Sequence, residues 1–315
     1  MLRTLSLGGR SDTAALRCGR SPSSAPRRPS HAAARCSAEP EPAGARLAAL
    51  VKRKHAEVGS LVEELGEEAL ELRMKDSVDT PREPPFAFAR AITAARVYGL
   101  PAIVMEIGRR RPNTTSAELA ELAKMYEGLG VDAIAVRTDA EDSPQGLLDL
   151  LEVRRAVKIP VLRKELMLHP IQVVEAKEAG AAGVIGTITS VLQGGTPTLT
   201  SYGAAIGMDC PVEIVNMDEM SKVEKFNVPL YGINLTVGLS VTIPGFTDSV
   251  MKGLVDNMPF GALTIVGART AEEAEVAVRH GADAAFLKWE LLQTMQPPEV
   301  RDLVNHIKYV GSGDD

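Results

Sequence analysis

Cysteine and aromatic residues are scarce in this chain, and their scarcity excludes several classes of protein. The three cysteines, Cys18, Cys36 and Cys210, are too few and too scattered for a disulfide framework or a zinc site. A net charge of −6 and an aromatic content of 4% argue against nucleic-acid binding, which needs a basic face and stacking rings. No apolar run approaches the roughly 20 residues of a membrane-spanning helix. We therefore expect no metal, no cofactor, no nucleic acid and no membrane partner.

Hydrophobic residues are plentiful by comparison. They make up 45% of the 315 residues, and charged residues make up 24%, which is the balance of a soluble globular protein with a sizeable core. The length exceeds that of one small module. One large domain with extensions fits it, because a closed α/β barrel takes about 250 residues.

The N-terminal segment differs in composition from the rest of the chain. Residues 1–36 contain seven arginines, one acidic residue and no lysine, among many Ser and Ala residues. This composition is typical of an organellar transit peptide, and the stretch from Ala32 to Ser37 favours a plastid. We therefore expect a disordered transit peptide over 1–36, a linker over 37–44, and a mature protein in the chloroplast stroma. The alternative is an ordinary disordered N-terminus.

Residues 45–99 have helical patterns that precede the repeating part of the chain. Apolar residues recur with helical periodicity from Ala45 to Met74, which predicts one or two helices. A proline-rich break follows from Asp79 to Pro85, and a short helix is predicted from Phe86 to Tyr98. We expect these residues to form a helical extension that packs on the main domain.

From residue 100 onward, short β-branched runs alternate with amphipathic helical stretches that end on glycine. Strands that read as continuous apolar runs, each followed by a helix, predict a parallel sheet buried on both faces. Eight such units over residues 100–310 predict an α/β fold, a (β/α)8 TIM barrel with additional N-terminal helices. An open doubly wound sheet is the alternative. The predicted strands are Ala102–Ile107, Ala133–Thr138, Val161–Leu166, Gly183–Ile188, Val212–Val215, Leu230–Leu235, Ala262–Val266 and Ala284–Leu287.

Four polar residues lie in or at the end of otherwise apolar strands: Glu106, Lys164, Glu213 and Asn234. In such barrels the chemistry takes place at the carboxyl ends of the strands. Carboxylates and an ammonium that point into one cavity perturb each other's pKa values, as acid–base catalysis requires. These residues therefore predict an active site, and the alternative is a structural salt-bridge network inside the barrel.

Short motifs surround these four residues in a fixed order along the chain. They are Met105-Glu106-Ile107, Leu162-Arg163-Lys164-Glu165-Leu166, Val212-Glu213-Ile214 and Gly232-Ile233-Asn234. In this order and spacing, the chain resembles the indole-3-glycerol phosphate synthase family over roughly residues 47–292. The resemblance implies a carboxy-lyase of tryptophan biosynthesis. Such an enzyme closes an anilino-deoxyribulose phosphate, a small phosphosugar substrate, onto its aromatic ring with loss of carbon dioxide and water.

The resemblance also implies a role for each of the four residues. Lys164 would act as general acid on the sugar carbonyl. Glu213 would accept and donate the proton in the later elimination. Glu106 and Asn234 would orient the substrate hydroxyls and the developing ring.

Several positions depart from the family pattern. Gly108 stands where the resemblance places a lysine that holds the departing carboxylate, and Leu166 stands where it places an aromatic residue. Lys288 and Trp289 replace a glycine and a small residue whose backbone receives the phosphate, so Trp289 is expected to crowd that position. These departures favour a second hypothesis, in which the barrel is catalytically inactive and serves binding, regulation or assembly.

Other residues compensate for these departures if the chain is an enzyme. Arg109, Arg110 and Arg111 follow Gly108, and a guanidinium binds carboxylate or phosphate bidentately. Lys288 adds a cation at the phosphate end, beside the retained Gly267. We therefore expect these five residues to bind substrate, and a solvated basic loop is the alternative for the three arginines.

Overall fold

The computed structural model describes residues 43–235 and 246–312. The predicted transit peptide, residues 1–36, and most of the predicted linker, residues 37–44, lie outside the described residues. Within the described ranges, no helix is both long enough and apolar enough to cross a membrane.

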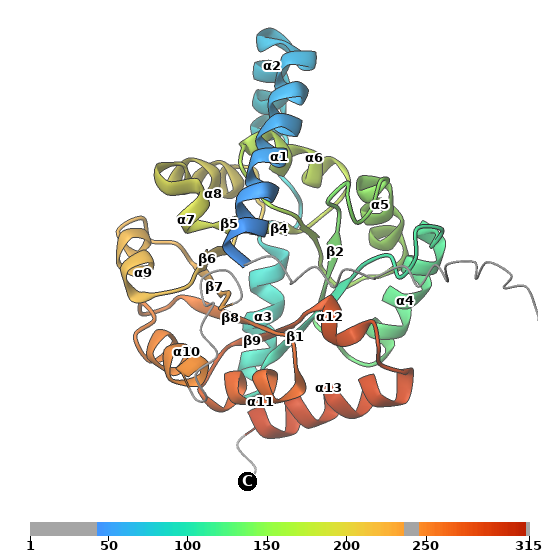
Figure 1. Ribbon diagram of the computed structural model, residues 1–315, viewed down its shortest axis with the longest axis vertical. Coiled ribbons are helices and arrows are strands. Elements are labelled where there is room, and N and C mark those ends of the chain that lie inside the picture. Colours follow the sequence, from blue (N-terminus) through green and yellow to red (C-terminus); the bar gives the residue numbers. More distant parts are fainter. Residues whose placement is uncertain (1–42, 236–245, 313–315) are drawn as a thin grey trace, which may run out of the picture. The chain divides into compact units, whose positions relative to one another are not determined.

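The strands form one parallel sheet that contains every predicted strand, and the predicted TIM barrel is confirmed (Figure 1). The order is β4-β3-β2-β1-β9-β8-β7-β6-β5, so sequential units are neighbours around the barrel. The strands are β1 (Ala102–Ile107), β2 (Ala133–Arg137), β3 (Val161–Lys164), β4 (Gly183–Ile185), β5 (Thr187–Ile188), β6 (Val212–Ile214), β7 (Leu230–Ile233), β8 (Leu263–Ala268) and β9 (Ala284–Leu287).

The fourth predicted strand is broken into β4 and β5 at Gly186, which has a φ of +123°. A Cβ at this position would overlap the carbonyl oxygen of Glu165, so only glycine allows the two backbones to approach this closely. β4 pairs with β3 and β5 pairs with β6, while a bridge between Gly183 and Asp209 joins the two sides. The barrel therefore closes through a strand that changes partners halfway along its length.

Helices cover the outside of the barrel, and the strands alternate between two cores (Figure 1). Ile103 and Met105 of β1 point outward and pack with Leu119 and other apolar residues of the helices. Val104 points inward, into a cluster that fills the barrel. The covering helices are α4 (Ser116–Gly128), α5 (Gly146–Ala156), α6 (Pro170–Glu178), α8 (Thr196–Ala205), α9 (Met217–Glu224), α10 (Phe246–Asp256), α11 (Ala271–Arg279) and α13 (Pro297–Gly311), with short turns at α7 (Thr189–Leu192) and α12 (Trp289–Leu292).

Three helices precede the barrel: α1 (Ala43–Leu65), α2 (Glu67–Asp79) and α3 (Ala87–Val97). The stretch predicted as one or two helices is divided by Gly66, whose φ of 72° ends the first helical run. α3 closes the N-terminal end of the barrel, because its fully buried Phe88 and Ile92 pack against the inward-facing Ala102 and Leu230.

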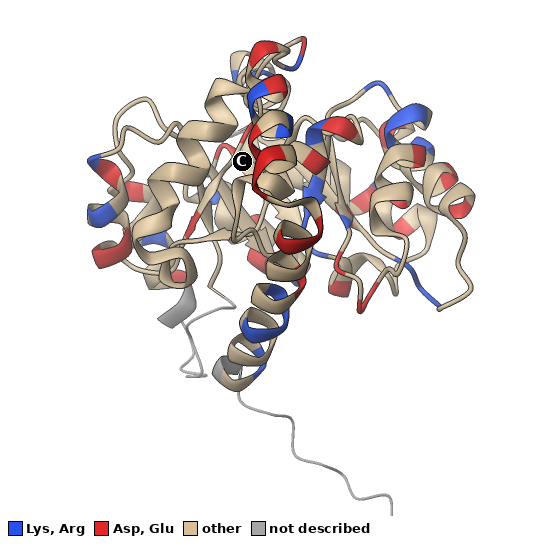
Figure 2. Cartoon of the chain, turned by 90° about the horizontal axis from the view of Figure 1, so that it is seen from above, with Lys and Arg blue, Asp and Glu red and all other residues tan. Residues whose placement is uncertain are grey.

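A buried ion pair attaches α1 to the barrel. Lys54 is 2% exposed, and its ammonium donates to Glu165 Oε1 at 2.5 Å, immediately after β3. The same Nζ lies 3.1 Å from Asp139 Oδ2, just beyond β2, and Arg53 Nη1 lies 2.8 Å from Asp139 Oδ1. Figure 2 shows α1 as the long helix that continues from the grey trace, with its basic residues nearest that end. The basic half of α1 therefore contacts the acidic residues that follow β2 and β3.

Asp209 attaches α3 to the loop before β6. Its Oδ2 accepts hydrogen bonds from the N–H groups of Phe88 at 2.9 Å and Ala89 at 3.3 Å. Burial nevertheless raises the pKa of this carboxyl to about 6, because the two N–H groups and the more distant Arg82 only partly offset the loss of hydration.

We predict that Asp209 makes the free energy of unfolding fall as pH rises from about 4 to about 6. In this range the folded chain keeps a proton that the unfolded chain releases, since the unfolded pKa is 3.8. A shift of about two pKa units corresponds to roughly 3 kcal/mol. Asp209→Asn removes this contribution, so the stability of wild type relative to the variant should decline across the range in urea denaturation. The exposed Asp302→Asn is the control, and a pH-independent difference for Asp209→Asn contradicts the prediction.

Candidate active site

A cavity of about 650 Å³ lies at the carboxyl ends of the strands, where barrel enzymes carry out their chemistry. Three of the four predicted catalytic residues line it, namely Glu106 of β1, Lys164 of β3 and Asn234 after β7. Lys288 lines it as well, directly after β9, and α1 supplies part of the wall. The structure therefore brings residues from four different strand ends into one concave site.

The fourth predicted catalytic residue, Glu213, lies deeper in the barrel beside Asn234 and Lys288. Asn234 Nδ2 donates to Glu213 Oε2 at 2.5 Å, and Lys288 Nζ donates to Asn234 Oδ1 at 3.0 Å. The other carboxylate oxygen, Glu213 Oε1, is buried and has no hydrogen-bond partner in the described part of the chain. Because a buried carboxylate oxygen without a partner is costly, this atom is a suitable acceptor for a proton or a ligand hydroxyl.

Glu106 is held by the backbone of Trp289, the first residue of α12, and by an arginine. Its Oε2 accepts the N–H of Trp289 at 3.1 Å, and its Oε1 lies 3.9 Å from Arg137 Nε. Burial raises the pKa of Glu106, and the positive charges of Lys164 and Arg137 only partly oppose this effect.

Two lysines share this cavity. Burial lowers the pKa of Lys288, and the positive charge of Lys164 lowers it further, against the charges of Glu213 and Glu106. Among residues 43–235 and 246–312, nothing forms a hydrogen bond or an ion pair with the Lys164 ammonium. Lys164 is therefore available to a ligand.

The two neighbours of Lys164 in the sequence, Arg163 and Glu165, are tied to each other and to the next strand end, and this network fixes the backbone on both sides of Lys164. Arg163 Nε donates to Glu165 Oε2 at 2.9 Å, and Thr138 Oγ1 donates to the same oxygen at 2.6 Å. Lys54 binds the other oxygen of Glu165. Sequence reasoning missed this support, although charged residues on both sides of Lys164 in an apolar strand were a signal for it.

The three consecutive arginines do not reach the central cavity. Both Nε and Nη2 of Arg109 donate to Asp149, at 2.8 and 2.7 Å, and Asp149 is completely buried. Arg110 Cζ lies 5.9 Å from the centre of the Trp289 ring, and the N–H of Arg111 donates to Thr114 Oγ1. The expected compensation for the missing lysine at position 108 therefore does not come from these three arginines.

Other side chains fill the space next to Gly108. A Cβ at this position would lie 2.9 Å from Arg137 Cδ and 3.3 Å from Trp289 Nε1. Arg137 also forms an ion pair with Asp142 and lines the central cavity, so it supplies a cation near Glu106. Sequence reasoning missed Arg137, which an arginine at the end of the apolar strand Ala133–Thr138 could have indicated.

At the end of β8, where the resemblance implies phosphate binding, a side chain lies against the backbone. A Cβ at Gly267 would lie 2.8 Å from Lys288 Cε, so the Lys288 side chain lies against this glycine. Trp289, which was expected to crowd the same end, packs instead in the outer core at 5% exposure. Within the described ranges, no group of three or more His, Cys, Asp or Glu side chains is arranged to hold a metal ion.

The sequence is similar to those of known proteins. A model of the family described as indole-3-glycerol phosphate synthase matches residues 47–296. The indole-3-glycerol phosphate synthase of Leifsonia xyli subsp. xyli is 29% identical over 240 residues, which cover 71% of this chain and 91% of that protein. The protein of that name from Opitutus terrae is 29% identical over 60% of this chain and 72% of its own. The one from Aquifex aeolicus is 30% identical over 52% and 63%. The chain therefore belongs to the indole-3-glycerol phosphate synthase family.

Proposed function

We propose that this protein catalyses the reaction for which its family is named, the decarboxylating ring closure of an anilino-deoxyribulose phosphate. One observation carries the proposal. Glu213, at the base position, has a buried carboxylate oxygen without a hydrogen-bond partner in the described part of the chain, and Lys164, at the acid position, lines the adjacent cavity. A purely structural salt-bridge network would pair such atoms, since an unpaired buried polar group is costly.

In this mechanism Lys164 acts during the ring closure and Glu213 acts during the later elimination. Lys164 donates a proton to the sugar carbonyl oxygen as the ring carbon that carries the carboxylate attacks the carbonyl carbon. Carbon dioxide then leaves, and the new hydroxyl departs as water. In this elimination Glu213 accepts a proton from the methylene carbon of the new five-membered ring and donates it to the departing hydroxyl, and the hydrogen bond from Asn234 holds Glu213 in place. Glu106 lines the same cavity, where it would orient the substrate's hydroxyl groups.

The second candidate function is that of a non-catalytic barrel. It is favoured by the Lys288 side chain, which lies against Gly267 and donates to Asn234. In this reading Lys288 takes up the space of the substrate phosphate, and the site keeps its shape without turning over substrate.

We predict that Lys164→Ala lowers kcat/KM for the ring closure by roughly 10²–10⁴-fold, because general acid catalysis contributes about this much. Carbon dioxide release and growth of a tryptophan-requiring strain that lacks the synthase are the two measurements. The exposed Lys158→Ala is the matched control and should retain full turnover. If wild type shows no turnover and does not support growth, the lyase proposal fails and the non-catalytic reading replaces it.

A second prediction concerns whether the Lys288 side chain binds phosphate or only fills the space that phosphate would occupy. If the ammonium binds phosphate, Lys288→Gly should weaken calorimetric binding of inorganic phosphate by at least about tenfold, as for loss of a charge-assisted hydrogen bond. If the side chain only fills the space, wild type should bind no phosphate and Lys288→Gly should gain binding. The second result contradicts the expectation that Lys288 binds the substrate phosphate.

We also propose that residues 1–36 direct the protein to the plastid stroma, on the basis of their seven arginines and single acid. A fusion of these residues to a fluorescent protein should enter plastids in plant or algal cells. A fusion in which the seven arginines are replaced by glutamine is the control and should remain in the cytosol. Equal distribution of the two fusions would overturn this proposal.

A further inference from the structure

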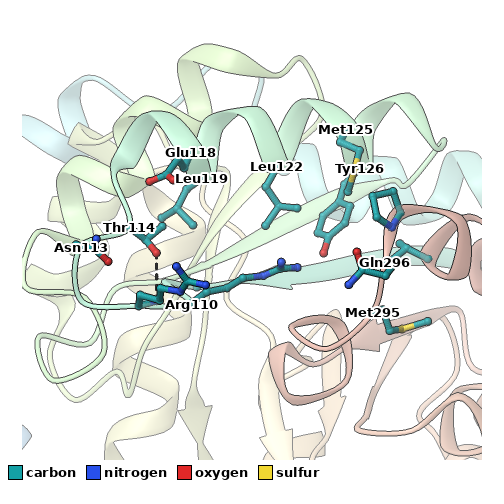
Figure 3. A pocket seen from close by; sticks show the side chains of 14 residues that line it. Arg110, Asn113, Thr114, Glu118, Leu119, Leu122, Met125, Tyr126, Met295 and Gln296 are labelled. Carbon is teal, nitrogen blue, oxygen red and sulfur yellow. Dashed lines mark hydrogen bonds between the residues drawn. The ribbon is translucent and has the colours of Figure 1, made fainter. Parts of the chain in front are cut away.

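A second cavity, of about 460 Å³, lies outside the ring of strands, between α4 and the segment that joins α12 to α13 (Figure 3). It shares no lining residue with the central cavity. Its volume is within the range of about 300–1,000 Å³ that is usual for small-molecule sites. The ring closure proposed above uses none of the residues in it.

One wall of this cavity is apolar. Leu119, Leu122 and Tyr126 project into it from α4, and Met295 and Gln296 face them from the segment before α13 (Figure 3). Leucine and tyrosine offer a hydrocarbon surface, and the flexible methionine adapts to the shape of what it contacts. This wall suits an aliphatic or aromatic group.

The cavity is also cationic. It is lined by Arg110 and Arg111, whose guanidinium groups form no hydrogen bond or ion pair within residues 43–235 and 246–312. Glu118 is the acidic residue of the lining, and it accepts hydrogen bonds from Thr115 N and Oγ1 at the start of α4. Two guanidinium groups therefore face one carboxylate that is already bound. A guanidinium binds an incoming carboxylate through two parallel hydrogen bonds.

Trp289 separates this cavity from the active site. Its ring lies under Arg110, with 5.9 Å between the Arg110 Cζ and the ring centre, while the backbone N–H of Trp289 donates to Glu106. It is the only tryptophan in the sequence. A ligand that engages the Arg110 guanidinium changes the charge beside this ring, so tryptophan fluorescence reports occupancy of the cavity directly.

We propose that this cavity binds a small amphipathic carboxylate, with its carboxylate on Arg110 and Arg111 and its hydrocarbon body against Leu122, Tyr126 and Met295. The two arginines that the sequence suggested for the substrate anion thus have a different ligand, in a different place. The proposal does not depend on turnover at the central cavity.

The experiment uses 3-phenylpropanoate as the probe with the full chain. An acid of this size is expected to bind with a Kd of the order of 1 mM. Calorimetric titration gives the affinity. The emission of Trp289, excited at the red edge of its absorption where the phenyl ring is transparent, should change with the same midpoint.

Variants assign the binding site. Arg110→Gln and Arg111→Gln should each weaken binding by about tenfold, as expected for loss of a charge-assisted hydrogen bond. Leu122→Asn should weaken it through loss of the apolar contact. The exposed Arg155→Gln on α5 is the matched control and should bind as wild type. The uncharged 3-phenylpropanamide should bind at least about tenfold more weakly than the acid.

Four results would overturn the proposal. The first is the absence of saturable binding up to about 10 mM, an order of magnitude above the expected Kd. The second is equal affinity for the acid and the amide, because the cavity would then not select an anion. The third is unchanged affinity in both arginine variants. The fourth is loss of binding in Lys164→Ala with retention in Arg110→Gln, which would locate the probe in the central cavity.

Discussion

The carboxylate of Glu165 connects the parts of the structure that hold the active site. It accepts hydrogen bonds from Lys54 of α1, from Arg163 of β3 and from Thr138 after β2. Burial by itself would raise its pKa, but the charges of Arg163 and Lys54 outweigh burial and hold the pKa below its ordinary value. Because the group stays ionised, α1, two strand ends and the backbone beside Lys164 remain fixed to one another.

The sequence predicts most of this fold, because its pattern is local. Each strand reads as a short apolar run and each helix as an amphipathic stretch. Eight repeats of that strand–helix pair are typical of a (β/α)8 barrel. The break at Gly186 was not predicted. Gly183–Ile188 reads as one continuous strand, and the reason for the break is the close approach of Glu165, which lies just after β3. Periodicity along one segment carries no information about such a contact.

Strand-end residues and loop residues differ in how well the sequence predicts their position. A residue in a strand points inward or outward according to its register, so Glu106, Lys164 and Asn234 are found where the alternation places them. Arg109 lies in a loop, and its direction depends on Asp149, forty residues away in α5. The charge of the three arginines suggested that they bind an anionic ligand. Only the tertiary structure reveals that the anion bound by Arg109 is Asp149, a residue of the protein itself.

The departures from the family pattern depend on one another. At position 108 the missing side chain leaves space that Arg137 and Trp289 fill, and the Trp289 N–H in turn holds Glu106. A lysine at position 108 would displace Arg137 from Glu106 and Asp142, so restoring this one residue would disturb the carboxyl group it is meant to assist. Residues in such direct contact do not act additively. The cation beside Glu106 is therefore Arg137 at the end of β2, and the site has to be judged as a whole rather than by single departures from the resemblance.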